Sequence, residues 1–203
     1  MTRDRSGWLL LAIAAAVFVW SAVRPHDRFT WMLEVFPAVI GAVVLLATWR
    51  RFRLSTLALV LITVHAIILM VGGKYTYALV PLGAWMEDWF GFTRNHYDRI
   101  GHFAQGFVPA IVAREILLRV ARLRRDRWLP AIVVSMCLAI SALYELLEWT
   151  VAALTGTAAE AFLGTQGDVW DTQKDMLLAL IGAICALTLL SRLHDRSMAK
   201  QAP

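Results

Sequence analysis

Charged residues are few in this sequence. Asp, Glu, Lys and Arg make up 17% of the 203 residues, whereas 59% are hydrophobic. In a soluble domain of this length, roughly a quarter of all residues would be charged. The mean hydropathy is +0.60, and several apolar runs approach the roughly 17–25 residues that a helix needs to cross a bilayer. These features exclude a soluble domain and predict an all-α, polytopic membrane protein.

Cysteine is scarce as well. The chain contains Cys137 and Cys185, and both fall within apolar segments. A free cysteine in such a segment usually behaves as a small buried hydrophobic residue. We therefore assign neither residue a role, and the sequence offers no support for a disulfide between them.

The familiar catalytic signatures are missing. The sequence has no H-E-x-x-H, no P-loop, no G-x-S-x-G and no EF-hand loop. The spacing of Asp168 and Asp171 does not match calcium loops, which carry acids at alternate positions. The one dense basic run, over 119–127, lacks interleaved aromatic residues, and we expect no nucleic-acid partner.

What the sequence does contain is a series of six apolar segments, which we expect to form a single integral membrane domain over 1–203. The predicted spans are 7–23, 31–49, 54–72, 100–118, 129–152 and 175–193. The first is longer than the apolar region of a secretory signal, roughly 7–15 residues, and we expect it to be retained. Between spans three and four, we expect a short surface helix over 84–90 with an interfacial aromatic belt.

The basic residues predict the orientation. The amino end, the 50–53 and 119–127 turns and the carboxyl tail carry 13 Lys and Arg residues, whereas the opposite loops carry six. Cytoplasmic loops of membrane proteins are the ones enriched in Lys and Arg. We therefore expect both termini in the cytoplasm. The basic loops can also contact anionic lipid headgroups.

Seven ionisable residues fall at one predicted depth, at the outer ends of three apolar segments. Charged groups in a membrane domain are costly and persist mainly where they pair, bind a cation or face water. We therefore predict an outward-facing site. The seven residues are Asp98, His102, Glu145, Glu148, Asp168, Asp171 and Asp175.

Two pairs have helical spacing. Asp98 and His102 lie four residues apart, so the carboxylate can orient the imidazole; a capped helix start with an interfacial histidine is an equal alternative. Glu145 and Glu148 lie three residues apart on one helix face. Two adjacent carboxylates suit acid–base work or metal ligation, and we favour either role over a structural salt bridge.

The third group begins the last predicted span. We expect Asp171 to cap that helix and Asp175 to lie in its first turn, where carboxylates satisfy free amides and suit the helix dipole. Capping does not explain Asp168, so structural and functional roles have equal weight for this group.

Carboxylates with one imidazole suit a divalent cation such as Mg²⁺, Mn²⁺ or Zn²⁺. Such a cation can polarise a phosphoryl or carbonyl group and activate water. Without it, His102 can act as a base and a glutamate as an acid. The predicted catalytic residues are Asp98, His102, Glu145 and Glu148. The predicted metal ligands are His102, Glu145, Glu148, Asp168, Asp171 and Asp175.

Three hypotheses remain open: an enzyme acting on a lipid-linked or phosphorylated envelope substrate, a proton- or cation-coupled carrier, and a non-catalytic binder of lipid or protein. An enzyme predicts that the acids converge on His102, with His65 remote. A carrier predicts a polar path through His65 towards Arg114 and Glu115, some 18 Å nearer the cytoplasm. A scaffold predicts acids that are each paired at their own helix end. For Arg114 and Glu115 themselves, we expect pairing or extension to the inner interface.

Three strings, YDRIGHFAQGFVPA at 97–110, YELLEW at 144–149 and GDVWDTQKDM at 167–176, closely resemble the YjdF-type family of bacterial inner-membrane proteins. This resemblance covers essentially the whole chain and implies a multi-pass inner-membrane protein, but no particular reaction. More distantly, the chain is similar to VanZ-like membrane proteins, some of which affect susceptibility to glycopeptide antibiotics. That likeness implies envelope chemistry. It maps onto Asp98, His102, Glu145 or Glu148, and Asp171 or Asp175, although the spacing before the last helix is longer here.

Overall fold

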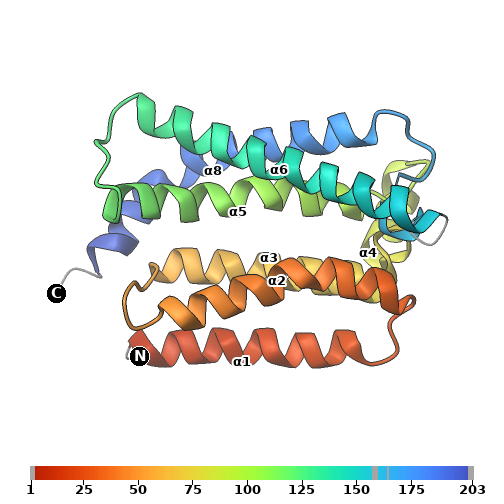
Figure 1. Ribbon diagram of the computed structural model, residues 1–203, viewed down its shortest axis with the longest axis horizontal. Coiled ribbons are helices and arrows are strands. Elements are labelled where there is room, and N and C mark those ends of the chain that lie inside the picture. The colour runs from red at the N-terminus through yellow and green to blue at the C-terminus, as the bar shows by residue number, and fades with distance from the viewer. Residues whose placement is uncertain (1–2, 157–159, 164, 201–203) are drawn as a thin grey trace.

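The protein is a bundle of long helices in a computed structural model that describes residues 3–156, 160–163 and 165–200 (Figure 1). Every regular element in these ranges is helical. The elements are α1 (Arg3–Ala22), α2 (Arg28–Thr48), α3 (Thr56–Tyr75), the 3₁₀ turn η1 (Tyr77–Leu79), α4 (Pro81–Phe90), α5 (Tyr97–Arg119), α6 (Trp128–Thr155), α7 (Glu160–Leu163) and α8 (Asp171–Ala199).

Five of these helices are long and apolar enough to cross a membrane: α1, α2, α3, α6 and α8. This confirms an all-α membrane protein. Helix α5, which covers the fourth predicted span, has 23 residues and is about 35 Å long. It does not meet the same apolar criterion, because polar residues occupy both of its ends.

The long helices form two groups that lie side by side (Figure 1). Helices α1 and α2 pack on α3, whereas α6 and α8 pack on α5. Helix α3 also packs on α5 and joins the two groups. Both ends of the chain lie at the same end of the bundle, opposite the surface helix α4 (Figure 1). Helix α5 is therefore enclosed by α3, α6 and α8.

Helices α5 and α8 approach each other to backbone contact. A Cβ atom added at Gly106 would lie 1.7 Å from the carbonyl oxygen of Ala179, and one added at Gly182 would lie 2.2 Å from that of Phe103. Small residues at a helix interface permit this approach, as is common within membranes. The contact fixes α8 against α5 along the face that carries the candidate site.

An apolar layer of buried residues packs inside the bundle. On α5, Ala110 and Ile111 are fully buried, and they lie between His102 and Arg114 in the sequence. The layer consists of Leu54, Ala58, Ala110, Ile111, Ala113, Leu129, Val133, Cys137, Ala183 and Ala186. Cys137 is thus a core residue, and both Cys137 and Cys185 are free thiols.

A second polar group, the His194 cluster, includes Arg114 and Glu115 near the C-terminal end of α5. The fully buried Glu115 accepts hydrogen bonds from the Ser55 backbone N–H at 2.8 Å and from His194 Nε2 at 3.0 Å. Arg114 lies 3.0 Å from His194 Nδ1 and forms a 2.8 Å ion pair with Asp195. The prediction that Arg114 and Glu115 pair is confirmed, since each has partners on other elements.

The predicted surface helix is present as α4. It begins at Pro81, three residues earlier than the predicted 84–90. Proline is well tolerated in the first helical turn, where its missing N–H has no intrahelical partner, so α4 can begin at Pro81. Trp85 and Trp89 are exposed on it, as an interfacial aromatic belt requires.

Candidate cation site and adjoining cavity

The imidazole of His102 lies among three carboxylates from three helices. Its Nε2 atom is 3.4 Å from Asp98 Oδ1 and 4.0 Å from Asp175 Oδ2, and its Nδ1 atom is 3.7 Å from Glu145 Oε1. All four side chains are buried. We call these four residues the His102 cluster.

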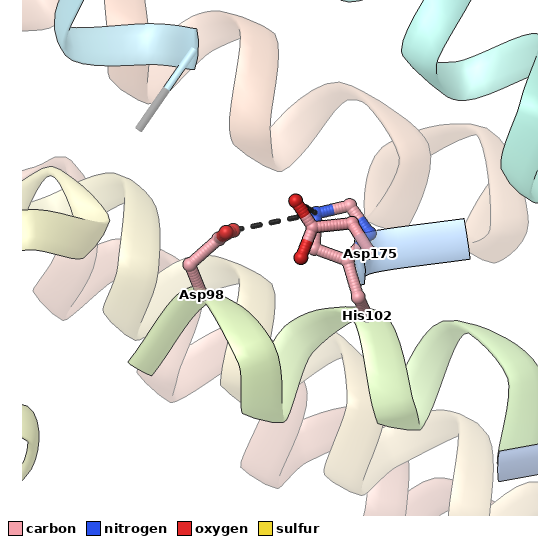
Figure 2. A group of neighbouring side chains, drawn as sticks. All are labelled: Asp98, His102 and Asp175. Carbon is pink, nitrogen blue, oxygen red and sulfur yellow. Dashed lines mark ion pairs between the residues drawn. The ribbon is translucent and has the colours of Figure 1, made fainter. Parts of the chain in front are cut away.

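Three members of this cluster are close enough to share one ion. One ligand atom each from Asp98, His102 and Asp175 all lie within 4.8 Å of one another. Figure 2 shows the three side chains converging, Asp98 and His102 from consecutive turns of α5 and Asp175 from α8. Ligand bonds of about 2.0–2.6 Å around one divalent cation allow separations of this size.

Several carboxylate oxygens in this cluster are buried without a hydrogen-bond partner among the described residues. They are Asp98 Oδ2, Glu145 Oε1 and Asp175 Oδ1. A buried charged group without a partner is strongly unfavourable. The donor set therefore fits a bound cation, because a cation would satisfy the oxygens and offset the repulsion between the carboxylates.

Gln105 orients the imidazole. Its Oε1 atom lies 3.1 Å from His102 Nδ1. With the amide oxygen as acceptor, Nδ1 carries the proton and Nε2 presents its lone pair towards Asp98 and Asp175. A ligand histidine in proteins is usually held in this way by a partner on its other ring nitrogen.

The predicted site residue Glu148 lies beside this cluster, on a cavity of about 220 Å³. We call it the central cavity. It is enclosed by α2, α3, α5 and α6 with η1, and its polar lining residues are Glu34, His65, Tyr77, Asp98, His102, Gln105, Tyr144 and Glu148.

The comparisons with known proteins agree with this membrane architecture. Residues 6–196 match the family model described as "Predicted membrane protein (DUF2238)". The chain belongs to this family. It is 50% identical to the inner membrane protein YjdF of Escherichia coli (strain K12) over 182 residues, which cover 90% of this chain and 87% of that protein. No solved structure matches the chain.

The family match and the apolar helices confirm the prediction of a multi-pass inner-membrane protein. The similarity to YjdF confirms the resemblance to the YjdF-type family. The two names assign no reaction. The distant VanZ-like resemblance stays a prediction.

In this member of the family, Asp168 and Asp171 lie in a network of basic residues. Asp168 Oδ2 is 2.6 Å from Lys174 Nζ and 2.9 Å from an Arg99 nitrogen, and Asp171 Oδ1 is 2.8 Å from an Arg94 nitrogen. Hydrogen bonds, chiefly from Lys174, lower the pKa of Asp168 from 3.8 to about 2. We call these five residues the Asp168 network.

The capping prediction for Asp171 is wrong. Helix α8 begins at Asp171 itself, Trp170 precedes it, and no side chain caps the helix. The Asp171 carboxylate turns to Arg94 instead, while Asp168 accepts from the Trp170 backbone N–H at 3.1 Å. Because Asp171 is the first residue of the helix rather than its cap, Asp175 lies beyond the first turn, where it reaches His102.

Glu34 was missed by the sequence analysis. It lies on α2, is 3% exposed, and lines the central cavity with Asp98 and Glu148. A signal was available, since Glu34 is the sole acid within the apolar second span and such acids are functional candidates by default.

The cavity is shaped by Tyr77. A Cβ atom added at Gly72 would lie 2.5 Å from the Tyr77 ring, and one added at Gly101 would lie 3.1 Å from it. The ring is thus wedged between α3 and α5, and two glycines make room for it. Burial raises the pKa of the Tyr77 hydroxyl well above its ordinary value, so the phenol stays neutral and can donate a hydrogen bond.

His65 lies on the central cavity and is therefore not remote from His102, contrary to the arrangement expected of an enzyme. Arg114 and Glu115, however, belong to the separate His194 cluster. The buried Ala110 and Ile111 lie between the two groups along α5, and neither Arg114 nor Glu115 is among the described residues that line the cavity.

Proposed function

We propose that this protein is a metal-assisted inner-membrane enzyme that acts on a lipid-linked or phosphorylated envelope substrate. The observation that carries the proposal is the convergence of Asp98, His102 and Asp175 within 4.8 Å, with buried carboxylate oxygens that have no partner among the described residues. Asp98, His102 and Asp175 would hold a divalent cation, and Glu145 would support His102 from its other side.

The cation would supply a Lewis acid for a phosphoryl or carbonyl oxygen. Glu148 lies on the cavity wall beside His102, where a carboxylate can accept a proton from water or a hydroxyl group. Gln105 keeps the imidazole in one orientation through its contact with Nδ1. The cavity and the cluster together would provide a binding space next to the reacting groups.

We also propose six membrane spans, with α5 as the sixth, both termini in the cytoplasm and the His102 cluster near the periplasmic face. Two observations support this topology: the Lys and Arg bias of the loops, and the position of both chain ends at one end of the bundle. Helix α5 is long enough to cross the bilayer, and α3, α6 and α8 shield its polar residues.

Cysteine accessibility tests the topology. In a background with Cys137→Ala and Cys185→Ala, the exposed loop positions Val169 and Arg124 are changed singly to cysteine. In intact cells of a bacterium with a permeabilised outer membrane, a membrane-impermeant maleimide should label V169C and spare R124C. The opposite labelling would reverse the proposed orientation.

Cation binding tests the site. The purified protein, stripped with a chelator, is titrated with Mn²⁺, Zn²⁺ and Mg²⁺ in a calorimeter. His102→Ala and Asp175→Asn should each lower the affinity by at least about tenfold, whereas Asp88→Asn on α4 should bind as the wild type does. If D175N and the wild type bound the cations with equal affinity, the proposed cation site would be wrong.

Activity is tested on an inner-membrane lipid extract. The protein is incubated with the extract and the preferred cation, and release of inorganic phosphate is followed. Release should require the cation and disappear in Glu148→Gln, a variant that keeps all three proposed ligands. Release that persists in both E148Q and H102A would come from a contaminant and count against the enzyme.

A proton- or cation-coupled carrier is the second candidate, because His65 and Glu34 line the same cavity. Proteoliposomes with an internal pH-sensitive dye separate the two. A cation-driven pH change that His65→Ala abolishes would favour a carrier. Cation binding without flux would favour an enzyme, or a non-catalytic binder if the lipid extract is also unchanged.

A further inference from the structure

The central cavity has a strongly acidic wall. Three carboxylates line it, Glu34 from α2, Asp98 from α5 and Glu148 from α6, and each is less than 10% exposed. No Lys or Arg is among the described residues that line it. A phosphate group would be repelled from such a wall, whereas a cationic group would replace the water that the carboxylates lose on burial.

The acids of the cavity do not form a second ion site. Among the described residues, the three-membered group close enough to hold one ion is Asp98, His102 and Asp175, and neither Glu34 nor Glu148 belongs to it. The volume of about 220 Å³ is many times the roughly 10–15 Å³ that holds one water molecule. The space therefore suits a small organic group rather than a single ion.

Unpartnered polar atoms point to a ligand independently of the charges. Asp98 is more than nine-tenths buried and lines the cavity, and its Oδ2 atom has no hydrogen-bond partner among the described residues. The hydroxyl of Tyr144 is buried on the same wall, also without a partner in the described part of the chain. A ligand that donates hydrogen bonds would satisfy Asp98 Oδ2, while Asp98 Oδ1, which faces His102 Nε2, would stay available to the cation.

We propose that the central cavity binds the primary ammonium group of an aminated headgroup, with Glu34 as the carboxylate that recognises it. This inference rests on the proposed function and names the substrate class of that site. An ammonium group offers a positive charge and three donors, which match a ring of carboxylate and phenol oxygens. The phosphoryl part of the same headgroup would then lie on the cation side of His102.

The cavity also reaches the surface of the bundle. Ile140 on α6 is 45% exposed and is one of its lining residues. Across the cavity, Glu34 and Pro37 belong to α2, which packs on α3 rather than along α6. A lipid headgroup could therefore enter between α2 and α6 from the membrane.

Lipid competition tests the proposal. The purified full-length protein is exchanged into equimolar phosphatidylethanolamine and phosphatidylglycerol, and retained lipids are counted by native mass spectrometry. The wild type should retain phosphatidylethanolamine in preference. Glu34→Gln should reduce that preference by about tenfold or more, as expected for the loss of a charged hydrogen-bond partner. Glu87→Gln on α4 is the matched control and should behave as the wild type.

Mn²⁺ titration of the same samples separates this proposal from the cation site. E34Q should keep the wild-type Mn²⁺ affinity and thermal midpoint. If Mn²⁺ fails to bind but the preference persists and depends on Glu34, the proposed function fails and amine recognition stands. An equal or greater retention of phosphatidylglycerol by the wild type, or an unchanged preference in a folded E34Q, would overturn amine recognition.

A soluble competitor identifies the source of the amine. Phosphoethanolamine is added to protein held in phosphatidylglycerol alone. Saturable binding that E34Q weakens would assign the cavity to a free aminated phosphate as well as to a lipid. Binding of the lipid alone would assign it to the membrane headgroup. Both results support recognition of the ammonium group.

Discussion

Gly106 and Ala179 are in backbone contact across the α5–α8 interface, where an added Cβ at position 106 would lie 1.7 Å from the Ala179 carbonyl oxygen. His102 lies one helical turn before Gly106, and Asp175 lies one turn before Ala179. The contact therefore sets the distance between His102 and Asp175. The interface that stabilises the bundle is also the one that builds the candidate site.

Gly106→Ala should separate the two helices. The added methyl group meets backbone rather than a movable side chain, so we expect a loss of about 1–3 kcal/mol or more in stability, and at least a tenfold loss in Mn²⁺ affinity. Gly41→Ala is the matched control, since nothing lies within 4 Å of a Cβ atom there. Thermal unfolding in detergent and Mn²⁺ titration give both quantities. If G106A bound Mn²⁺ with wild-type affinity, the α5–α8 contact would not determine the geometry of the candidate site.

Asp175→Asn should stabilise the cation-free protein. Asp175 Oδ1 is buried without a partner among the described residues, and two more carboxylates surround His102. Removal of one charge should relieve about 1 kcal/mol or more of repulsion and desolvation, which raises the midpoint by roughly 2–4 °C. Mn²⁺ should raise the midpoint of the wild type and leave that of D175N unchanged. A lower cation-free midpoint would show that Asp175 is a structural partner of His102.

Glu115→Ala should unfold the opposite end of the bundle without touching the site. It would leave His194 and the Ser55 N–H without their acceptor, at a cost of about 3–5 kcal/mol. Glu115→Gln should cost less, because the amide oxygen still accepts one hydrogen bond. The folded fraction of either variant should bind Mn²⁺ with wild-type affinity. A parallel loss of affinity would mean that the two polar clusters are coupled.

The Asp168 network should weaken in acid. In the folded protein the pKa of Asp168 is lowered from 3.8 to about 2, first by the hydrogen bond from Lys174. A lowered carboxyl pKa stabilises the fold above the unfolded pKa, so this contribution is complete above about pH 4 and is lost as the pH falls towards 2. The midpoint difference between wild type and Asp168→Asn should be present at pH 6 and shrink at pH 2.5. If the midpoint difference were the same at both pH values, the charge of Asp168 would not be the cause of the stabilisation.

The sequence predicted that Asp98 and His102 share a helix face, because helical spacing is a local property. Asp98 and His102 share a face through their four-residue spacing, and that pairing is present at 3.4 Å. The convergence of Asp175 on them follows from the small residues of α5 and α8, which place the two backbones in contact.

The partners of Asp171 and the role of Glu34 depend on tertiary packing instead. Arg94 lies 77 residues from Asp171 in the sequence, and no local sequence pattern predicts their contact. Glu34 could be noticed as an acid in an apolar span, but its direction depends on how α2 packs beside α3 and α5. The spacing of apolar residues along the sequence does not predict how these helices pack.

The polarity of α5 has a consequence for how the protein is made. A helix with Asp98 and His102 near one end and Arg114 and Glu115 near the other partitions poorly into lipid by itself. Its neighbour α3 is synthesised before it, but α6 and α8 follow. Insertion of α5 should therefore depend on helices that the ribosome has not yet completed. Asp175 cannot join Asp98 and His102 until α8 is in place.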